Sequence, residues 1–359
     1  MRDIAVERLF CQQLAYSKFK LPGDVVSWLG AIQAQDYAGA KWSIGLRLSG
    51  STEAGIEKAL NDKAIIRTWA MRGTLHFIAA ADVRWMLELL APRVIAGNAS
   101  RYKQLGLDKQ TFVQSNAVLV DALQNGKQMT RKELLPVLRQ NGISTEGQRA
   151  PYILQRASID GLICQVSMRR NDPVYMLLDN AVPGGRKMKR EDALAELARR
   201  YFKSRGPATL KDYIWWSGLT AADARAGLEA IKLQLSSETI DGEIYWLDPT
   251  IQAENSVPSN ICLLPSFDEY LIGYKDRSAS LVDPQYKKLS SLSTGMPNPT
   301  VIKNGRVVGI WKRTLKKQKV ILAIKPFNAL SAADLNDLKE EELRYGEYIG
   351  LSVEIQKYD

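Results

Sequence analysis

The first part of the fold is decided by residues 65–78, IIRTWAMRGTLHFI. Residues 65–69 and 74–78 are rich in β-branched and aromatic side chains, which predicts two short strands, and Met71-Arg72-Gly73 separates them. Apolar residues at helical spacing predict helices upstream at residues 2–19, 25–34 and 52–62. Helices followed by a two-stranded ribbon predict a winged helix, which is a variant of the helix-turn-helix.

The same order of elements recurs twice further along the chain. In the second unit, Thr130 and Glu133 form the capping-box pattern that opens a helix. In the third unit, Thr209 and Thr220 are predicted helix caps, and Asp241-Gly242 is the predicted turn of a hairpin. The other predicted elements are helices at about 145–161 and 193–202 and strands at about 162–166, 174–178, 233–240 and 243–247.

From about residue 256 the chain changes to short β-like runs, and Asn304-Gly305 is a hairpin turn signal between two of them. A helix at 332–345 is expected to carry its acidic side chains on exposed positions. The predicted fold is therefore α+β, with three tandem winged-helix modules and a β-rich C-terminal domain. The predicted domains are 1–108, with the motif Gln33-Ala34-Gln35, then 109–185, 186–255, and 256–359 with a basic hairpin.

Composition excludes several classes of protein. The 359 residues are 45% hydrophobic and 25% charged, which is typical of globular domains and not of disordered chains. No apolar run approaches the roughly 18–20 residues of a membrane-spanning helix, and charges near the N-terminus argue against a signal peptide, so we expect a cytoplasmic protein. The 3 cysteines and 1 histidine fit neither a disulfide framework nor a zinc site. We therefore expect no metal and no cofactor.

The charge balance favours a polyanionic partner. There are 49 Lys and Arg residues against 39 Asp and Glu residues, a formal charge of +10. Residues 303–319 carry 7 basic side chains and no acidic one, and residues 186–205 carry 8 basic side chains against 3 acidic ones. Solvated charge runs are the alternative explanation.

No phosphate-binding glycine loop, nucleophile elbow or metalloprotease motif is present, but Gln33-Ala34-Gln35 is distinctive. Two residues at i and i+2 share one face of an extended segment and diverge on a helix, so the end of the predicted helix at 25–34 matters. An amide pair is able to hold and orient a water molecule. Taken alone, such a pair is more typical of a solvated helix terminus.

Six blocks of sequence carry a family resemblance. They are QAQD (33–36), RTWAMRGTLH (67–76), RGPAT (205–209), WWSGL (215–219), LPSFDEYLIGYKDR (264–277) and NGRVVG (304–309). In this order they resemble the AlkZ-like winged-helix DNA glycosylases, over nearly the whole chain. The resemblance implies three winged helices and a β-rich domain around a DNA-binding surface, and hydrolysis of the N-glycosidic bond of alkylated purines, interstrand crosslinks included. It also implies that Gln33 and Gln35 are the catalytic residues.

The implied chemistry needs no titrating base. Glutamine does not accept a proton near neutral pH. A purine alkylated at N7 or N3 already bears positive charge, however, so its glycosidic bond is labile and the leaving base needs no protonation. The enzyme then has to position water and stabilise an oxocarbenium-like sugar.

The other candidate residues fall into two groups. Residues expected to contact DNA are Arg67, Arg72, His76, Arg306, Lys312 and Arg313. Residues expected to support the site are Asp36, Trp69, Asp268 and Arg277, with Asp268 holding Arg277 or a backbone amide. For Arg67 and Arg72, pairing with an acid such as Asp36 is the alternative. We expect His76 to be structural or to face the DNA backbone, and Trp215 and Trp216 to lie in the core of the third module.

The sequence thus predicts a monomeric, monofunctional DNA glycosylase that binds double-stranded DNA containing alkylated purines and no membrane. The alternative function is that of a non-catalytic winged-helix DNA-binding or regulatory protein. Three modules in one chain favour a monomer on duplex DNA, because regulators of this kind usually pair as dimers on two half-sites.

Overall fold

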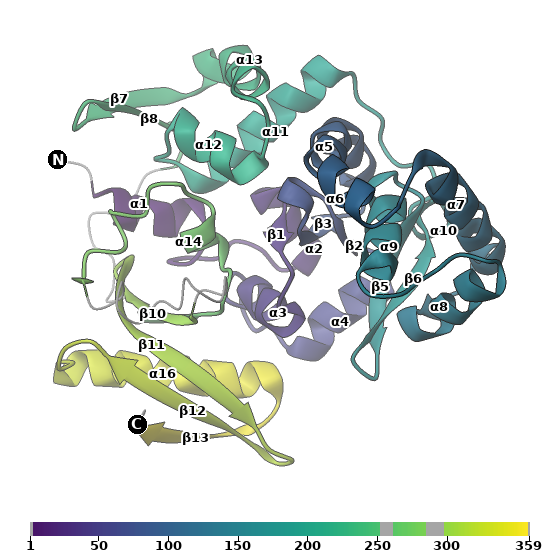
Figure 1. Ribbon diagram of the computed structural model, residues 1–359. Helices are drawn as coiled ribbons and strands as arrows, with labels where there is room; N and C mark the ends of the chain where they lie inside the picture. The colour runs from purple at the N-terminus through teal and green to yellow at the C-terminus, as the bar shows by residue number, and fades with distance from the viewer. Residues whose placement is uncertain (1–2, 252–260, 285–297, 358–359) are drawn as a thin grey trace.

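The computed structural model describes residues 3–251, 261–284 and 298–357 (Figure 1). The predicted domain boundary between residues 255 and 256 lies outside these ranges. The first part of the chain contains α1 (Ile4–Cys11), α2 (Pro22–Leu29), β1 (Ile32–Gln33), α3 (Tyr37–Gly45), α4 (Glu53–Asn61), β2 (Ile65–Trp69), the short 3-10 helix η1 (Met71–Gly73) and β3 (Leu75–Ala79). The ribbon of β2 and β3 is therefore as predicted.

The second part of the chain adds further helices and a second two-stranded ribbon. It contains α5 (Val83–Gly97), α6 (Ala99–Gln104), α7 (Lys109–Leu123), β4 (Met129–Thr130), α8 (Arg131–Gln140), α9 (Arg149–Ile159), β5 (Ile163–Arg169), β6 (Asp172–Leu177) and α10 (Leu178–Ala181). The predicted capping box at Thr130 and Glu133 is confirmed, since each side chain bonds the other's backbone N–H. The two ribbons form one sheet in the order β1-β3-β2-β5-β6-β4, joined where Arg67 pairs with Gln165.

The third part is mostly helical. It contains α11 (Arg190–Arg205), α12 (Leu210–Ser217), α13 (Ala221–Ile231), the 3-10 helix η2 (Lys232–Gln234), β7 (Ser236–Ile240) and β8 (Glu243–Leu247). Thr209 and Thr220 cap α12 and α13 as predicted. Strands β7 and β8 form a separate hairpin, and both residues of its Asp241-Gly242 turn have positive φ, as the predicted turn requires.

The C-terminal part is a five-stranded sheet with a long helix beside it (Figure 1). It contains β9 (Ile261–Leu264), α14 (Glu269–Ile272), β10 (Thr300–Lys303), β11 (Arg306–Leu315), β12 (Lys319–Pro326), α16 (Ala332–Ile349) and β13 (Ser352–Lys357). The strand order is β13-β12-β11-β10-β9, and the predicted turn at Asn304-Gly305 joins β10 to β11. The fold is thus α+β, as expected. Within the described residues no helix is long and apolar enough to cross a bilayer.

Hydrophobic cores connect parts of the chain that are far apart in sequence. Helices α2–α4 share a core with the C-terminal sheet and α16, where the indole of Trp42 donates to Leu263 O (2.7 Å) and lies 4.8 Å from the rings of Tyr345 and Tyr348. A second core joins the β2–β3 ribbon to α11 and α12 through buried residues such as Ile66 and Trp216. The first part of the chain therefore packs against the C-terminal part through one core and against the third part through the other.

The predicted helix at 25–34 is wrong at its C-terminal end. Helix α2 stops at Leu29, because Gly30 adopts a positive φ of 75° that ends the helix. Ile32 and Gln33 then pair with Phe77 and His76 as strand β1. The first glutamine of the motif therefore lies on a sheet edge and not on a helix.

The predicted exposure of the acidic side chains on α16 is also wrong for several residues. Asp334, Glu341 and Glu342 are buried, because this face of the amphipathic helix packs against the sheet. Burial raises the pKa of Glu342 to about 7, with Lys339 opposing the shift.

We expect Glu342→Gln to raise the free energy of unfolding at about pH 8 more than at about pH 5. Folding raises the pKa of this carboxyl group from 4.5 to about 7, so the folded protein loses stability as pH rises through that interval. Glutamine does not titrate, so the variant avoids this loss. Denaturation curves at the two pH values measure this. Glu340→Gln, at an exposed position of the same helix, is the control. An equal change at both pH values would contradict the assignment.

Candidate functional site

The backbone of the Gln33-Ala34-Gln35 motif is fixed by contacts from three directions. Ala34 N donates to Leu75 O on β3 (2.7 Å), and Gln33 N donates to the Glu269 carboxylate (3.0 Å). Ala34 O accepts two hydrogen bonds from the Arg67 guanidinium, from Nε at 3.1 Å and Nη2 at 2.8 Å. The peptide groups that carry the two glutamine side chains are thereby held in one position.

The two glutamine side chains have different surroundings. Gln33 is only 9% exposed; its Nε2 donates to Thr74 Oγ1 at 3.5 Å, while its Oε1 is buried and has no hydrogen-bond partner among the described residues. Gln35, two positions on, is exposed. A buried amide oxygen without a partner is costly unless a water or a ligand supplies a donor. The motif thus combines an unfilled acceptor with a side chain that substrate is able to reach.

Asp36 turns the chain from the strand into helix α3. Its side chain caps the helix by accepting from Gly39 N (3.0 Å). A Cβ atom at Gly39 would lie 2.5 Å from Asp36 Oδ2, so this cap needs glycine there. Asp36 therefore supports the end of the motif through the backbone.

Arg67, which we expected to contact DNA, is buried within the protein. Besides Ala34 O, its guanidinium binds Gln165 Oε1 on β5 at 2.7 Å, and Gln165 in turn donates to Tyr175 Oη at 3.0 Å. Its donors are thus directed at the glutamine motif and at the second ribbon. No local pattern predicts the contact between Arg67 and Gln165, since the two residues are 98 positions apart.

Glu269 is the site residue that sequence reasoning missed. Its buried carboxylate accepts from Gln33 N, from Arg205 Nη2 (2.6 Å) and from the Trp216 indole (2.9 Å). The Glu269 and Arg205 side chains are 1% and 0% exposed. The only signal available in the sequence was that Glu269, Arg205 and Trp216 fall in blocks that carry the family resemblance.

The neighbouring Asp268 has a structural environment. Its carboxylate forms a buried two-point ion pair with Arg47 (2.8 and 2.9 Å), accepts from Ser43 Oγ, and caps α14 through Tyr270 N. Burial opposes its ionisation, but Arg47 and these hydrogen bonds outweigh burial and keep the pKa of Asp268 below its usual range. The backbone amide that we expected Asp268 to hold is that of Tyr270, and its ion-pair partner is Arg47. Arg277 Nε donates to Tyr274 O instead (3.2 Å).

His76 is neutral at physiological pH. It is 1% exposed, its Nδ1 lies 2.9 Å from Thr74 O, and it pairs in register with Gln33. Burial, helped by the charge of Arg72, lowers the pKa of His76 to about 4. Its imidazole is thus a packed group at the back of the glutamine motif.

Arg72 and the tryptophans connect the ribbon to α12. Arg72 is half-buried, and its guanidinium donates to the main-chain oxygens of Trp215 and Trp216. Trp216 is fully buried as expected, but Trp215 is 44% exposed, so the core prediction is wrong for Trp215. Neighbouring residues on a helix point about 100° apart, which allows only one of the two to face the core. Trp69, at the end of β2, is half-buried against the second unit.

The three predicted DNA contacts of the C-terminal domain all lie on β11. Arg306 pairs with Asp3 (2.9 Å) and Lys312 is exposed. Arg313 donates to Tyr345 Oη at 2.5 Å. Burial works against its charge, but Tyr345 and, more weakly, Asp36 leave the pKa of Arg313 raised. The influence of Asp36 places Arg313 in the neighbourhood of the glutamine motif.

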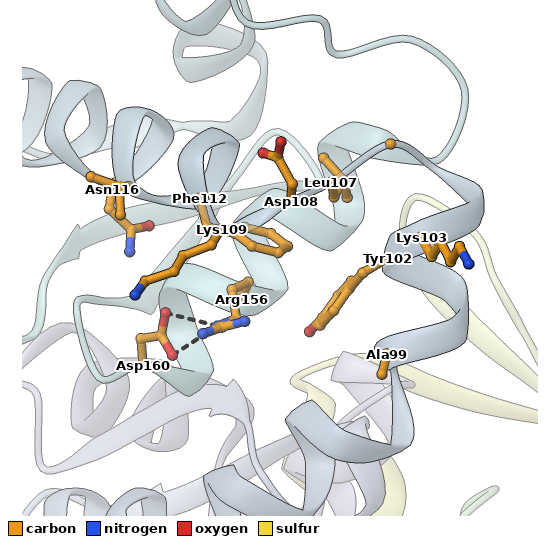
Figure 2. Close-up of a pocket in the computed structure, with 12 residues that line it drawn as sticks. Ala99, Tyr102, Lys103, Leu107, Asp108, Lys109, Phe112, Asn116, Arg156 and Asp160 are labelled. Atoms are coloured by element: carbon orange, nitrogen blue, oxygen red, sulfur yellow. Dashed lines mark hydrogen bonds and ion pairs between the residues drawn. The ribbon is translucent and has the colours of Figure 1, made fainter.

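A separate cavity of about 580 Å³ lies between α6, α7 and α9 (Figure 2). Tyr102 and Phe112 line it, with the Arg156–Asp160 ion pair at its edge. None of the residues predicted for the site lines this cavity. Among the described residues, no group of three or more His, Cys, Asp or Glu side chains is arranged to hold a metal ion.

Comparisons with known proteins show which family the chain belongs to. A family model described as "DNA glycosylase AlkZ-like" matches residues 26–348. The chain belongs to the AlkZ-like DNA glycosylase family. The enzyme class expected from the sequence, a DNA glycosylase, is thus confirmed, and DNA is the substrate.

Two relatives come from Streptomyces sahachiroi. The chain is 25% identical over 303 residues to a protein named "Interstrand DNA cross-link repair glycosylase", covering 80% of this chain and 81% of the relative. The solved structure of Streptomyces sahachiroi DNA glycosylase AlkZ matches with a TM-score of 0.80 at 23% identity, over 99% of this chain and 98% of that chain. At this identity the structural match shows that the two chains share a fold.

We expect Arg67→Lys to slow single-turnover base release about ten- to a hundredfold while leaving DNA affinity unchanged. Lysine keeps the charge but cannot make the two-pronged bond to Ala34 O, so the motif loses its fixed position. Arg84→Lys is the matched control, since Arg84, like Arg67, binds one side-chain oxygen and one main-chain oxygen, here those of Asp179 and Val182. Equal rates in the two variants would contradict a positioning role for Arg67.

We also expect base release to be independent of pH between about pH 6 and about pH 9. The glutamines do not titrate, and His76, with a pKa of about 4, stays neutral throughout. The measurement is the single-turnover rate at saturating enzyme. A step centred near the ordinary histidine pKa of about 6.5 would show that a titrating group takes part in the reaction.

Proposed function

We propose that this DNA glycosylase hydrolyses the N-glycosidic bond of alkylated purines, with Gln33 and Gln35 as its catalytic residues. The observation that carries the proposal is the buried, unpartnered Oε1 of Gln33 two residues from the exposed Gln35, on a backbone held rigid. A water that donates to Gln33 Oε1 gains a fixed position, and the Gln35 amide completes its orientation toward the sugar.

The two carboxylates at the motif both have structural contacts, and that of Asp36 caps α3 through Gly39 N. Glu269 accepts from Gln33 N, Arg205 and Trp216, so its charge is balanced by an arginine and its oxygens are committed. The site therefore offers neutral amides to the reacting water. Such a site is sufficient for an N7- or N3-alkylated purine, whose positive charge makes the base a good leaving group, and is too weak for normal nucleosides. The site therefore selects alkylated purines over normal bases, because only the alkylated purines leave readily enough.

The proposal includes the way in which the protein binds DNA. Three winged-helix units and the β-rich domain form a surface for duplex DNA, with one copy of the chain acting alone. Lys312, Arg313 and Arg306 on β11 contact phosphates, and such contacts position a protein on DNA without reading its bases. The name of the Streptomyces sahachiroi relative favours interstrand crosslinks as further substrates.

We expect Gln35→Ala to slow release of 7-methylguanine roughly ten- to a thousandfold, which corresponds to about 1.4–4 kcal/mol for one lost positioning contact. Affinity for undamaged DNA should barely change, because the side chain acts at the lesion. The measurement is single-turnover release at equal DNA occupancy. Gln114→Ala, at an exposed glutamine on α7, is the control.

Two results would contradict this proposal. Equal rates for wild type and Gln35→Ala would remove Gln35 from catalysis. No release by the wild type, with DNA binding intact, would favour a non-catalytic DNA-binding function.

A further inference from the structure

A second cavity is lined by Arg72, two residues from Thr74, whose hydroxyl binds the Gln33 side chain. It measures about 380 Å³ and is formed by the C-terminal half of α5, the turn between β2 and β3, and the end of α12. Arg72, Arg93, Asn98, Ser217 and Gly218 contribute to its lining. No acidic residue lines it, in contrast to the larger cavity at α6 and α7, which contains Asp108 and Asp160. Its charge therefore favours an anion.

The main chain is shaped to place Arg72 in this cavity. Arg72 has a positive φ of 54°, an uncommon conformation for a residue other than glycine and one that is concentrated at functional sites. Its Nη1 bonds the carbonyl groups at the C-terminus of α12, which carries the negative end of the helix dipole. A Cβ atom at Gly218 would lie 3.1 Å from Arg72 Cγ, so glycine makes room for this arrangement.

The side chain of Arg72 keeps donors for a ligand. Within the part of the chain that the structure describes, its Nε and Nη2 form no hydrogen bond, and the exposed Arg93 forms no ion pair. Burial lowers the pKa of Arg72; the charge of Glu269 opposes this shift, and Arg205 and Arg277 add smaller repulsions. Two guanidinium groups thus face one cavity without an anion between them.

The rim of the cavity is held by the second unit. Asn98 Nδ2 donates to Gln155 Oε1 (3.0 Å), and Gln155 Nε2 donates to Gly73 O (2.9 Å). Gly73 adjoins Thr74, whose hydroxyl accepts from Gln33 Nε2. The charge of Arg72 also helps to lower the pKa of His76, which pairs with Gln33 in the sheet. Cavity and motif are therefore one connected piece of structure.

We propose that this Arg72–Arg93 cavity binds a single backbone phosphate of the lesion-containing strand, close to the nucleotide whose base is released. The inference rests on the proposed function and adds a substrate subsite to it. Arginine suits the task, because its planar donors match phosphate oxygens in two-point contacts. A phosphate fixed there sets the distance between the sugar and the two glutamines.

The test is a scan with single methylphosphonates, which remove the charge of one phosphate, at each position within a few nucleotides of 7-methylguanine in a duplex. Binding is measured by fluorescence anisotropy for wild type, Arg93→Gln and Arg225→Gln. Arg225 is an exposed arginine on α13 and serves as the matched control. Arg93 is exposed on α5, so its substitution leaves the core intact.

We expect one position at which the methylphosphonate weakens wild-type and Arg225→Gln binding about tenfold, the loss of one charge-assisted contact. At that position Arg93→Gln should be affected less than about twofold, and its salt dependence should be shallower by about 0.9 in log–log slope. An identical pattern in Arg93→Gln and wild type would overturn the proposal. Competition by inorganic phosphate without any sensitive DNA position would also overturn it, because the cavity would then bind a free anion.

Base release is measured on the same duplexes, which separates the two proposals. If the phosphate pattern appears but no protein releases 7-methylguanine, the proposed action on alkylated purines fails for this chain and the phosphate site stands. If base is released but the pattern is absent, the phosphate site alone fails.

Discussion

The buried carboxylate of Glu269 is the interaction on which the site depends. It joins Gln33 N on β1, Arg205 at the end of α11 and the Trp216 indole of α12, and it belongs itself to the C-terminal part of the chain. Three regions far apart in sequence thus meet at one charged group. Removing one partner from a buried ion pair costs several kcal/mol, so this junction keeps the domains and the motif in a fixed relation.

On the mechanism proposed above no general base takes part, and the rigidity of the motif then has a chemical purpose. Glutamine gives no proton-transfer advantage, so its whole contribution comes from placing water and aiming a dipole at the developing positive charge of the sugar. Glu269 fixes the peptide group between Ile32 and Gln33, Arg67 fixes that between Ala34 and Gln35, and the neutral His76 adds no competing charge. Catalysis by position alone requires this degree of fixation, because a displacement of about 1 Å can cost about a hundredfold in rate.

Local signals in the sequence were sufficient for much of the fold and for the location of the motif. The caps at Thr130 and Thr209, the Asp241-Gly242 turn and the β2–β3 ribbon depend on neighbouring residues, and all are present. The strand at Gln33 was missed, because only pairing with β3 reveals it. Glu269 and the contacts of Arg67 within the protein were missed for a related reason: their partners lie 236 and 33 residues away. Burial of a charged side chain depends on tertiary partners, which composition and periodicity do not show.

The central claim is that Gln33 and Gln35 together hold the attacking water. A high-resolution crystal structure with DNA that contains a stable analogue of the abasic sugar tests it most directly. We expect an ordered water that donates to Gln33 Oε1, contacts the Gln35 amide and lies on the sugar face opposite the departed base. A structure in which a DNA group fills the acceptor of Gln33, with no water between the two glutamines, would contradict it.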